Sequence, residues 1–230
     1  MKKLSIIFSI MLMGAFASCN SAGSGSKITT TKDSLSYAIG SIMSQQLKTL
    51  GMTPDDVNGQ VLAAAVHDAL ANQEPSITLQ QSQELVQHYV TVVVPERNKK
   101  ASDDFLAQIK KDNKNAVETP SGLVYEIVNL GDTTLHPTAQ DTVLAHYTGT
   151  FPSGEVFDSS EDRGEPAMFP LSGVIPGWTE GLQLIGPGGE IKLYIPSSLA
   201  YGEYGSGPIG PNQALVFDVK LQKVMKAAKK

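Results

Sequence analysis

Apolar residues recur at steps of three and four through the first half of the chain, which is the spacing of one helix face. Three such faces are formed by Leu35, Ala38, Ile39 and Ile42, by Val57, Val61, Leu62 and Val66, and by Leu85, Val86, Tyr89 and Val93. Thr53 followed by Pro54 and two acids predicts the start of the second helix, and Thr78 with Gln81 predicts a capping box at the start of the third. The sequence therefore predicts a helical region that begins near Asp33.

Pro95 interrupts the third helix. Its ring lacks an amide hydrogen and crowds the preceding turn, so we expect a kink or break near residues 92–94. Helical spacing resumes with Ala101, Phe105 and Ile109 and ends at about residues 114–117. These helices carry many small apolar residues and few aromatic ones, so one copy alone would form a thin core. Burial against a second copy, as a homodimer, is therefore expected.

From residue 121 onward the apolar period changes to two, which is the spacing of strands. The alternating residues are Leu123, Tyr125 and Ile127, then Val143, Ala145 and Tyr147, then Ile191, Leu193 and Ile195, and finally Leu215, Phe217, Val219 and Leu221. Glycine and proline clusters separate these runs, and only residues 176–184 predict a helix among them. We expect an α+β fold in which an antiparallel sheet curls around one short helix.

The first residues have the pattern of a secretory signal. Lys2 and Lys3 precede a short apolar run, and Ala17, Ser18 and Cys19 follow it. The run is too short to span a bilayer comfortably, which needs about 20 apolar residues. The segment resembles the lipobox of bacterial lipoproteins, in which the cysteine receives a diacylglycerol and becomes the mature N-terminus. The alternative is a plain cleaved signal peptide with an incidental cysteine.

These patterns divide the chain into four predicted segments. They are a signal peptide over residues 1–18, a lipidated flexible tether over 19–32, a helical module with a connecting helix over 33–117, and a sheet domain over 118–230. The lipobox resemblance implies a protein that is lipid-anchored in the bacterial cell envelope, on the periplasm-facing side of the outer membrane.

Composition removes several classes of function. The net charge of −5 gives no global reason to expect nucleic-acid binding. With a single cysteine, neither an internal disulfide nor a cysteine-based zinc cluster can form. The four histidines form no metal-ligand pair, so we expect no metal site and no cofactor.

Five blocks in the second half resemble the FKBP family of peptidyl-prolyl cis-trans isomerases. The blocks are residues 143–149 (VLAHYTG), 154–160 (GEVFDSS), 174–181 (VIPGWTEG), 200–202 (AYG) and 215–219 (LVFDV). Their order and spacing match the family over roughly residues 119–224. The helical half resembles secreted two-part members of the macrophage infectivity potentiator type, on residues 36–40 and 119–123. That resemblance implies a dimerisation module and a connecting helix before the isomerase domain.

The resemblance implies an apolar pocket for a proline ring. Its lining would be Tyr147, Phe157, Val174, Ile175, Trp178 and Phe217, with further contributions from Phe169 and Ile209. Trp178 would form the floor, Asp158 and the Tyr201 hydroxyl the polar rim, and the Ile175 amide a donor to a substrate carbonyl. Taken singly, each aromatic residue would instead be assigned to core packing. Macrolide inhibitors are further expected ligands of this pocket. Ala167 stands where eukaryotic single-domain members have an aromatic wall, so the affinity for macrolides is expected to be altered.

Rotation about a prolyl amide requires no nucleophile, metal or proton transfer. The amide resists rotation by about 18–20 kcal/mol because resonance stabilises its planar form. A dry pocket stabilises that polar planar form less than water does, and so lowers the barrier. The resemblance therefore predicts an isomerase acting on proline-containing polypeptides that fold outside the cytoplasm. The alternative is a non-catalytic holdase or binding module that uses the sheet domain and a cleft between the helices.

Overall fold

The computed structural model describes residues 27–228 of the chain. The predicted signal peptide and Cys19 lie outside the described residues. The residues up to Ile42 and those from Met43 onward form two compact units, and each is described by itself.

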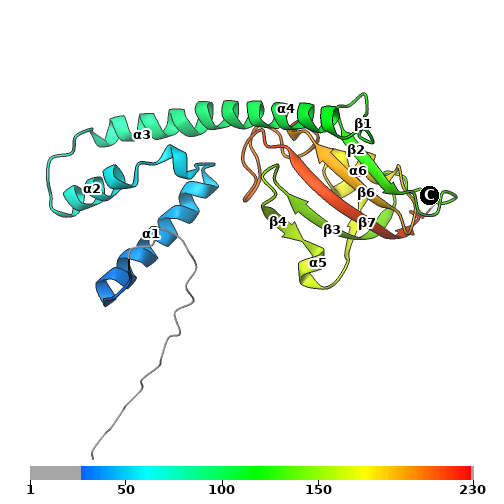
Figure 1. The fold of residues 1–230 in the computed structure, drawn as a ribbon, viewed down its shortest axis with the longest axis horizontal. Coiled ribbons are helices and arrows are strands. Elements are labelled where there is room, and N and C mark those ends of the chain that lie inside the picture. Colours follow the sequence, from blue (N-terminus) through cyan, green and yellow to red (C-terminus); the bar gives the residue numbers. More distant parts are fainter. Residues whose placement is uncertain (1–26, 229–230) are drawn as a thin grey trace, which may run out of the picture. The chain divides into compact units, whose positions relative to one another are not determined.

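The first half is helical, as the apolar spacing predicts (Figure 1). Its elements are α1 (Thr31–Thr49), the 3₁₀ turn η1 (Pro54–Asp56), α2 (Gly59–Leu70), α3 (Leu79–His88), the π-helical turn η2 (Tyr89–Val93) and α4 (Val94–Asp112). The predicted capping box at α3 is confirmed. The Gln81 amide donates to the Thr78 hydroxyl at 3.2 Å, and the Thr78 amide donates to the Gln81 side chain at 2.8 Å.

The predicted start of the second helix at Thr53 is wrong by several residues. Thr53 and Pro54 begin the η1 turn, and α2 starts at Gly59 with Asn58 as its cap. The Asp56 carboxylate accepts hydrogen bonds from Arg97 of α4 at 2.7 Å and from the Tyr89 hydroxyl. These bonds attach η1 to the connecting helix, so the acid that suggested a first helical turn serves a tertiary contact instead.

The predicted irregularity before Pro95 takes the form of a π-helical turn. The amide of Val94 donates to the carbonyl of Tyr89, five residues earlier, in place of the usual four. The wider turn precedes the proline, which has no amide to donate. The segments α3, η2 and α4 follow one another without a loop, so the predicted break does not occur and the helix continues through the proline.

The second half is an antiparallel seven-stranded sheet, as predicted. Its strands are β1 (Val117–Glu118), β2 (Val124–Asn129), β3 (Thr142–Thr150), β4 (Val156–Ser159), β5 (Ala167–Pro170), β6 (Glu190–Ile195) and β7 (Leu215–Met225). The order across the sheet is β1-β2-β6-β7-β3-β4, and β5 pairs with β3 beside this path. The shorter elements are α5 (Ser160–Arg163), α6 (Pro176–Leu182) and two 3₁₀ turns, η3 (Leu171–Gly173) and η4 (Ser197–Leu199).

The short helix α6 lies close to the sheet because two glycines face it. A β-carbon on Gly177 would lie 2.5 Å from the Ile195 side chain, and one on Gly181 would lie 2.5 Å from Leu193. Strand alternation brings Leu193 and Ile195 to the same face of β6, where they are fully buried. The main core therefore fills the space between α6 and the inner face of the sheet.

The outer face of the sheet carries a smaller core that involves the connecting helix. Val124, Tyr194 and Val216 are buried there, and Phe105 and Ile109 of α4 pack against them. The rings of Phe105 and Tyr194 have centroids 6.2 Å apart. The second half of α4 is thus part of the same packed body as the sheet.

Candidate functional site

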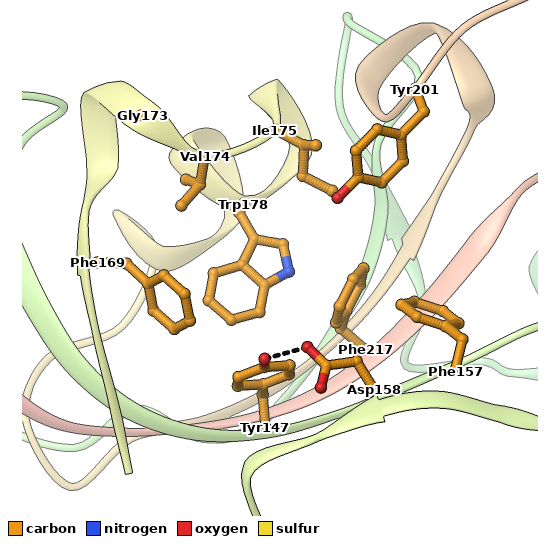
Figure 2. A pocket seen from close by; sticks show the side chains of 10 residues that line it. All are labelled: Tyr147, Phe157, Asp158, Phe169, Gly173, Val174, Ile175, Trp178, Tyr201 and Phe217. Carbon is orange, nitrogen blue, oxygen red and sulfur yellow. Dashed lines mark hydrogen bonds between the residues drawn. The ribbon is translucent and has the colours of Figure 1, made fainter. Parts of the chain in front are cut away.

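A pocket of about 450 Å³ opens at one end of the inner core. Its lining residues come from seven places in the fold, as Figure 2 shows: Tyr147 of β3, Phe157 and Asp158 of β4, Phe169 of β5, Gly173 to Ile175 after β5, Trp178 of α6, Tyr201 after η4 and Phe217 of β7. The volume is within the range of about 300–1,000 Å³ that is usual for ligand pockets.

Trp178 forms the floor, and three aromatic rings stand around it. The ring centroids of Tyr147, Phe169 and Phe217 each lie 5.2 Å from that of Trp178, at interplanar angles of 86°, 74° and 84°. Phe157 continues the wall, edge-on to Phe217 at 5.5 Å. These edge-to-face contacts are favourable for aromatic pairs and hold the rings in fixed orientations. The pocket is therefore a rigid aromatic cup.

One glycine makes room for the wall. A β-carbon at Gly149 of β3 would lie 2.6 Å from the Phe157 ring and 2.8 Å from the Phe217 ring. Since real β-carbons are not found so close to other atoms, any larger residue would push both rings into the pocket.

The polar edge of the pocket is a cluster of three side chains. The Tyr147 hydroxyl donates to the Asp158 carboxylate (dashed line in Figure 2), and Arg163 of α5 donates to both Asp158 and the Tyr147 hydroxyl, the latter at 2.9 Å. Burial alone would raise the pKa of Asp158, but the hydrogen bonds from Tyr147 and Arg163 outweigh it and hold this pKa below its ordinary value of 3.8. Burial and the neighbouring carboxylate raise the pKa of Tyr147. Asp158 is thus an ionised acceptor and Tyr147 a neutral phenol at neutral pH.

Two further polar groups border the pocket. The amide of Ile175 precedes the first turn of α6 and has no hydrogen-bond acceptor within residues 27–228. Figure 2 shows the Tyr201 hydroxyl directed toward Ile175, and this side chain is 39% exposed. The Thr179 hydroxyl donates to the Leu171 carbonyl at 2.6 Å, which holds the loop carrying Val174 and Ile175 against α6. A bound carbonyl could accept from either donor.

The structure brings together all but one of the predicted pocket residues. Ile209 is not among the lining residues; it is buried in the main core. Ala167 also lies outside the lining and packs against that core from β5. Arg163 was missed by sequence reasoning. Arg163 ends the one-turn helix that follows Asp158, and no sequence pattern marks so short a helix.

His146 lies away from the pocket, as strand alternation predicts. Its Nδ1 is 3.2 Å from the Ser160 hydroxyl and 3.7 Å from the Glu161 carboxylate, and it is not among the lining residues. Among residues 27–228 no group of three or more His, Cys, Asp or Glu side chains could hold a metal ion. Within the same range, no helix has both the length and the apolar content needed to cross a membrane.

Comparison with known proteins decides the family. The profile of the FKBP-type peptidyl-prolyl cis-trans isomerases matches residues 133–222, and that of the domain amino-terminal to such isomerases matches residues 32–127. The outer membrane protein MIP of Legionella longbeachae is 36% identical over 98% of this chain and 100% of its own length. This chain belongs to the FKBP-type peptidyl-prolyl cis-trans isomerases. The isomerase activity, which the five blocks predicted, follows from this membership.

Two further comparisons agree with this family. The FkpA isomerase of Aeromonas hydrophila is 40% identical, over 84% of this chain and 76% of its own. The crystal structure of FkpA from Escherichia coli is similar with a TM-score of 0.56 at 35% identity, over 88% of this chain and 100% of that one. The predicted fold class, a helical region followed by a curled antiparallel sheet, is confirmed.

Proposed function

We propose that the aromatic cup is the site at which this isomerase receives the prolyl ring. The observation that carries the proposal is the floor of Trp178 within three rings at equal centroid distances of 5.2 Å. Phe157, Val174 and Ile175 would complete the apolar wall. The free amide of Ile175 and the Tyr201 hydroxyl would bind substrate carbonyls, which fixes the residue before proline while its amide rotates.

The cup would act on the barrier by taking the amide out of water. In water the planar, charge-separated amide is well solvated, and this solvation is lost as the bond twists. Apolar rings replace that solvation with weaker interactions, so the planar ground state would lose more stabilisation than the twisted state, and the barrier would fall. The ionised Asp158 holds the Tyr147 and Arg163 side chains and transfers no proton.

A substitution in the wall tests this assignment. Phe157→Ala should lower kcat/KM on a proline tetrapeptide by at least about tenfold, or 1.4 kcal/mol of transition-state stabilisation, because water would reach the amide. His146→Ala is the matched control, since His146 lies on β3 beside Tyr147 but outside the pocket. If the His146 variant lost more activity than the Phe157 variant, the cup would not be the site.

Macrolide inhibitors are candidate ligands of the same cup. Ala167 supplies no aromatic ring on the β5 side, where only Phe169 contributes to the lining. A macrolide would therefore meet a wall that is smaller on this side, and its affinity would be reduced accordingly.

The clients are proposed to be polypeptides that fold outside the cytoplasm, with the isomerase held in the bacterial envelope. The support is the sequence Ala17, Ser18 and Cys19, which lies outside the described residues, and the naming of one relative as an outer membrane protein. A diacylglycerol on Cys19 would hold the chain at the outer membrane, facing the periplasm.

Removing the anchoring cysteine tests the proposed location. The variant Cys19→Ala should carry no lipid and should escape the lipoprotein-specific cleavage, so its mass should change and its association with the membrane should weaken. Mass spectrometry and fractionation of cells measure both effects. An unchanged mass together with unchanged membrane association would contradict the anchor.

A further inference from the structure

A second groove, of about 330 Å³, lies beside the aromatic cup. Its walls are the turn after α1 (residues 48–54), the turn between β3 and β4 (residues 151–155) and the loop before β7 (residues 208–213), with Asn98 of α4 among them. All of these residues belong to the unit that begins at Met43. Nothing in the isomerase site described above uses this groove.

The groove adjoins the cup through one aromatic contact. Phe151 lines the groove and Phe157 lines the cup, and their ring centroids are 5.1 Å apart. Both residues belong to the β3–β4 hairpin region, so their spacing is fixed by the sheet. An extended chain advances about 3.3 Å per residue. A few residues beyond a proline in the cup would therefore reach the groove.

The polar groups of the groove match those of a polypeptide backbone. Asn98 donates its Nδ2 to the Pro211 carbonyl at 2.9 Å, and Gln213 accepts the Gly210 amide on its Oε1 at 2.9 Å. The other end of each side chain, Asn98 Oδ1 and Gln213 Nε2, has no partner within residues 27–228. One is an acceptor and the other a donor, which is what one peptide group requires.

The two amides lie together around Gly210. A β-carbon on Gly210 would be 3.2 Å from Asn98 Nδ2 and 3.3 Å from Gln213 Oε1. A side chain at this position would crowd both amides, so glycine lets them lie close together. Met52, Pro54, Phe151 and Pro208 add apolar surface to the walls, and Lys48 and Glu155 bring one charge of each sign. Such a lining favours a polypeptide segment with both apolar and polar groups over a ligand that carries charge of a single sign.

The wall formed by the turn after α1 is held firmly to α4. Arg97 donates to the Asp56 carboxylate at 2.7 Å and to the Gly51 carbonyl at 2.6 Å. Gly51 has a φ of +75°, and a β-carbon on it would lie 2.7 Å from the side chain of Val94, which is fully buried. The pKa of Asp56 is lowered well below its ordinary value because the hydrogen bonds from Tyr89, Thr53 and Arg97 outweigh its burial. The ion pair therefore persists at neutral pH.

The opposite wall is held to the same helix. The Ser102 hydroxyl donates to the Asn212 carbonyl at 2.9 Å, and Asn212 donates its Nδ2 to the Pro95 carbonyl at 3.3 Å. Both walls are thus attached to the first half of helix α4, and we infer that the groove is preformed. A preformed site of this kind loses little conformational entropy when a polypeptide chain binds to it.

We propose that this groove binds the extended segment of an unfolded polypeptide that flanks the proline held in the aromatic cup. The inference rests on the proposed function and extends it, because it gives the isomerase a preference for long chains over short peptides. The occupant is the backbone of the client itself, recognised by one acceptor and one donor on Asn98 and Gln213.

The test compares a proline tetrapeptide with the same peptide extended by six residues on either its N-terminal or its C-terminal side. Binding of fluorescently labelled peptides to the full chain is followed by polarisation, and kcat/KM is measured in parallel. One of the two extended peptides should bind at least about tenfold more tightly than the tetrapeptide. The other should show a smaller gain, because the groove lies on one side of the cup.

Two variants locate that gain in the groove. Gln213→Glu keeps the acceptor for the Gly210 amide but removes the free donor, and Ser153→Trp fills the groove from an exposed turn position. Each should reduce the ratio of the two affinities to about twofold or less. Gln222→Glu is the matched control for added charge, because Gln222 is exposed on β7 and outside the groove, and it should retain the full ratio.

The outcomes separate the groove from the cup. If the wild-type chain showed no gain for either extended peptide, or if both groove variants kept the gain, the groove proposal would be overturned. If the extended peptide kept its advantage but the Phe157→Ala variant turned over tetrapeptides normally, the groove would stand and the assignment of the cup would fail.

Discussion

Three polar side chains at the edge of the cup form a closed hydrogen-bond cluster. Asp158 accepts from Tyr147 and Arg163, and Arg163 also lies over the Tyr147 ring at 5.6 Å from its centroid. The carboxylate is therefore held by a neutral phenol and a guanidinium cation. This arrangement orients the Tyr147 ring against Trp178 and leaves no free base beside the amide.

The cluster predicts a flat pH profile. The pKa of Asp158 is lowered from 3.8 and the pKa of Tyr147 is raised from 10.0, so neither group titrates between pH 6 and 8. Because the folded pKa of Asp158 is depressed, the stability it contributes is present above its unfolded pKa of about 3.9 and is lost only as pH falls through the folded value.

We expect constant kcat/KM from pH 6 to 8 on a proline tetrapeptide. Asp158→Asn should lose less activity than Phe157→Ala and stay flat, whereas a bell-shaped profile would indicate proton transfer.

Trp178 also carries an indole N–H group whose burial does not stabilise the fold. Its Nε1 is buried and has no hydrogen-bond partner in the described part of the chain. An unpaired buried donor costs about 1–3 kcal/mol. A phenylalanine would avoid that cost. The larger indole instead gives the cup a wide flat floor, which matches a role in holding a ring.

At the residue scale, sequence reasoning succeeded where the family blocks supplied spacing. No local pattern distinguishes Phe157 or Phe217 from core residues, and only their place in the blocks assigned them to a pocket. Arg163 lies in the charged stretch Glu161, Asp162 and Arg163, which is indistinguishable from a solvated surface. Its role depends on the return of α5 toward β3, and that return is a tertiary feature.

Among the elements, the long periodic ones could be predicted and the short ones could not. Strands β3, β6 and β7 alternate over six residues or more, and their core-facing residues were identified correctly. Strands β4 and β5 and helix α5 have four residues each, which is too few for a period to be recognised. The η1 turn was predicted as the start of a helix because a capped acidic turn contains the same residue types as the first turn of a helix.

One buried hydroxyl makes two of the hydrogen bonds that join the connecting helix to the loop before β7 (residues 208–214). Ser102 of α4 accepts the Ala214 amide at 2.8 Å and donates to the Asn212 carbonyl at 2.9 Å. Ala214 is fully buried and Asn212 has a φ of +54°, so neither can easily find another partner. In the sequence this loop lies between two residues of the cup, Tyr201 and Phe217. Its position depends on the hydrogen bonds of Ser102.

Removing that hydroxyl should destabilise the protein. Ser102→Ala leaves the buried Ala214 amide without an acceptor, which costs about 1–3 kcal/mol in the free energy of unfolding. Ser82→Ala is the control, since the exposed Ser82 hydroxyl bonds only within its own helix, at 3.0 Å to the Thr78 carbonyl. Its effect should stay within about 0.5 kcal/mol. Urea denaturation followed by fluorescence of the single tryptophan measures both, and equal midpoints for the two variants would exclude the bridging role.

The helices α1, α2 and α3 contain no buried residue, although the structure describes all of them. Leu35 and Ile42 are 62% and 64% exposed, and Leu70 is 82% exposed. Helices with apolar faces of this kind are stable only when another surface covers them. A second copy of the chain would supply that cover, and we propose that the helical module dimerises. By contrast, α4 is already covered on one side by the sheet through Phe105 and Ile109.

Truncation should separate these two roles of the helical half. The full mature chain should sediment as a dimer at micromolar concentration, and a fragment over residues 94–228 should be a folded monomer that isomerises tetrapeptides. A fragment over residues 115–228 loses Phe105 and Ile109, so Val124, Tyr194 and Val216 become exposed.

The stability of the shorter fragment follows from this exposure. At about 1.5–3 kcal/mol for each large side chain buried, its free energy of unfolding should be lower than that of the 94–228 fragment by roughly 3 kcal/mol or more. Analytical ultracentrifugation and urea denaturation measure these outcomes. A monomeric full chain would contradict the dimer, and equal stability of the two fragments would show that α4 is only a spacer.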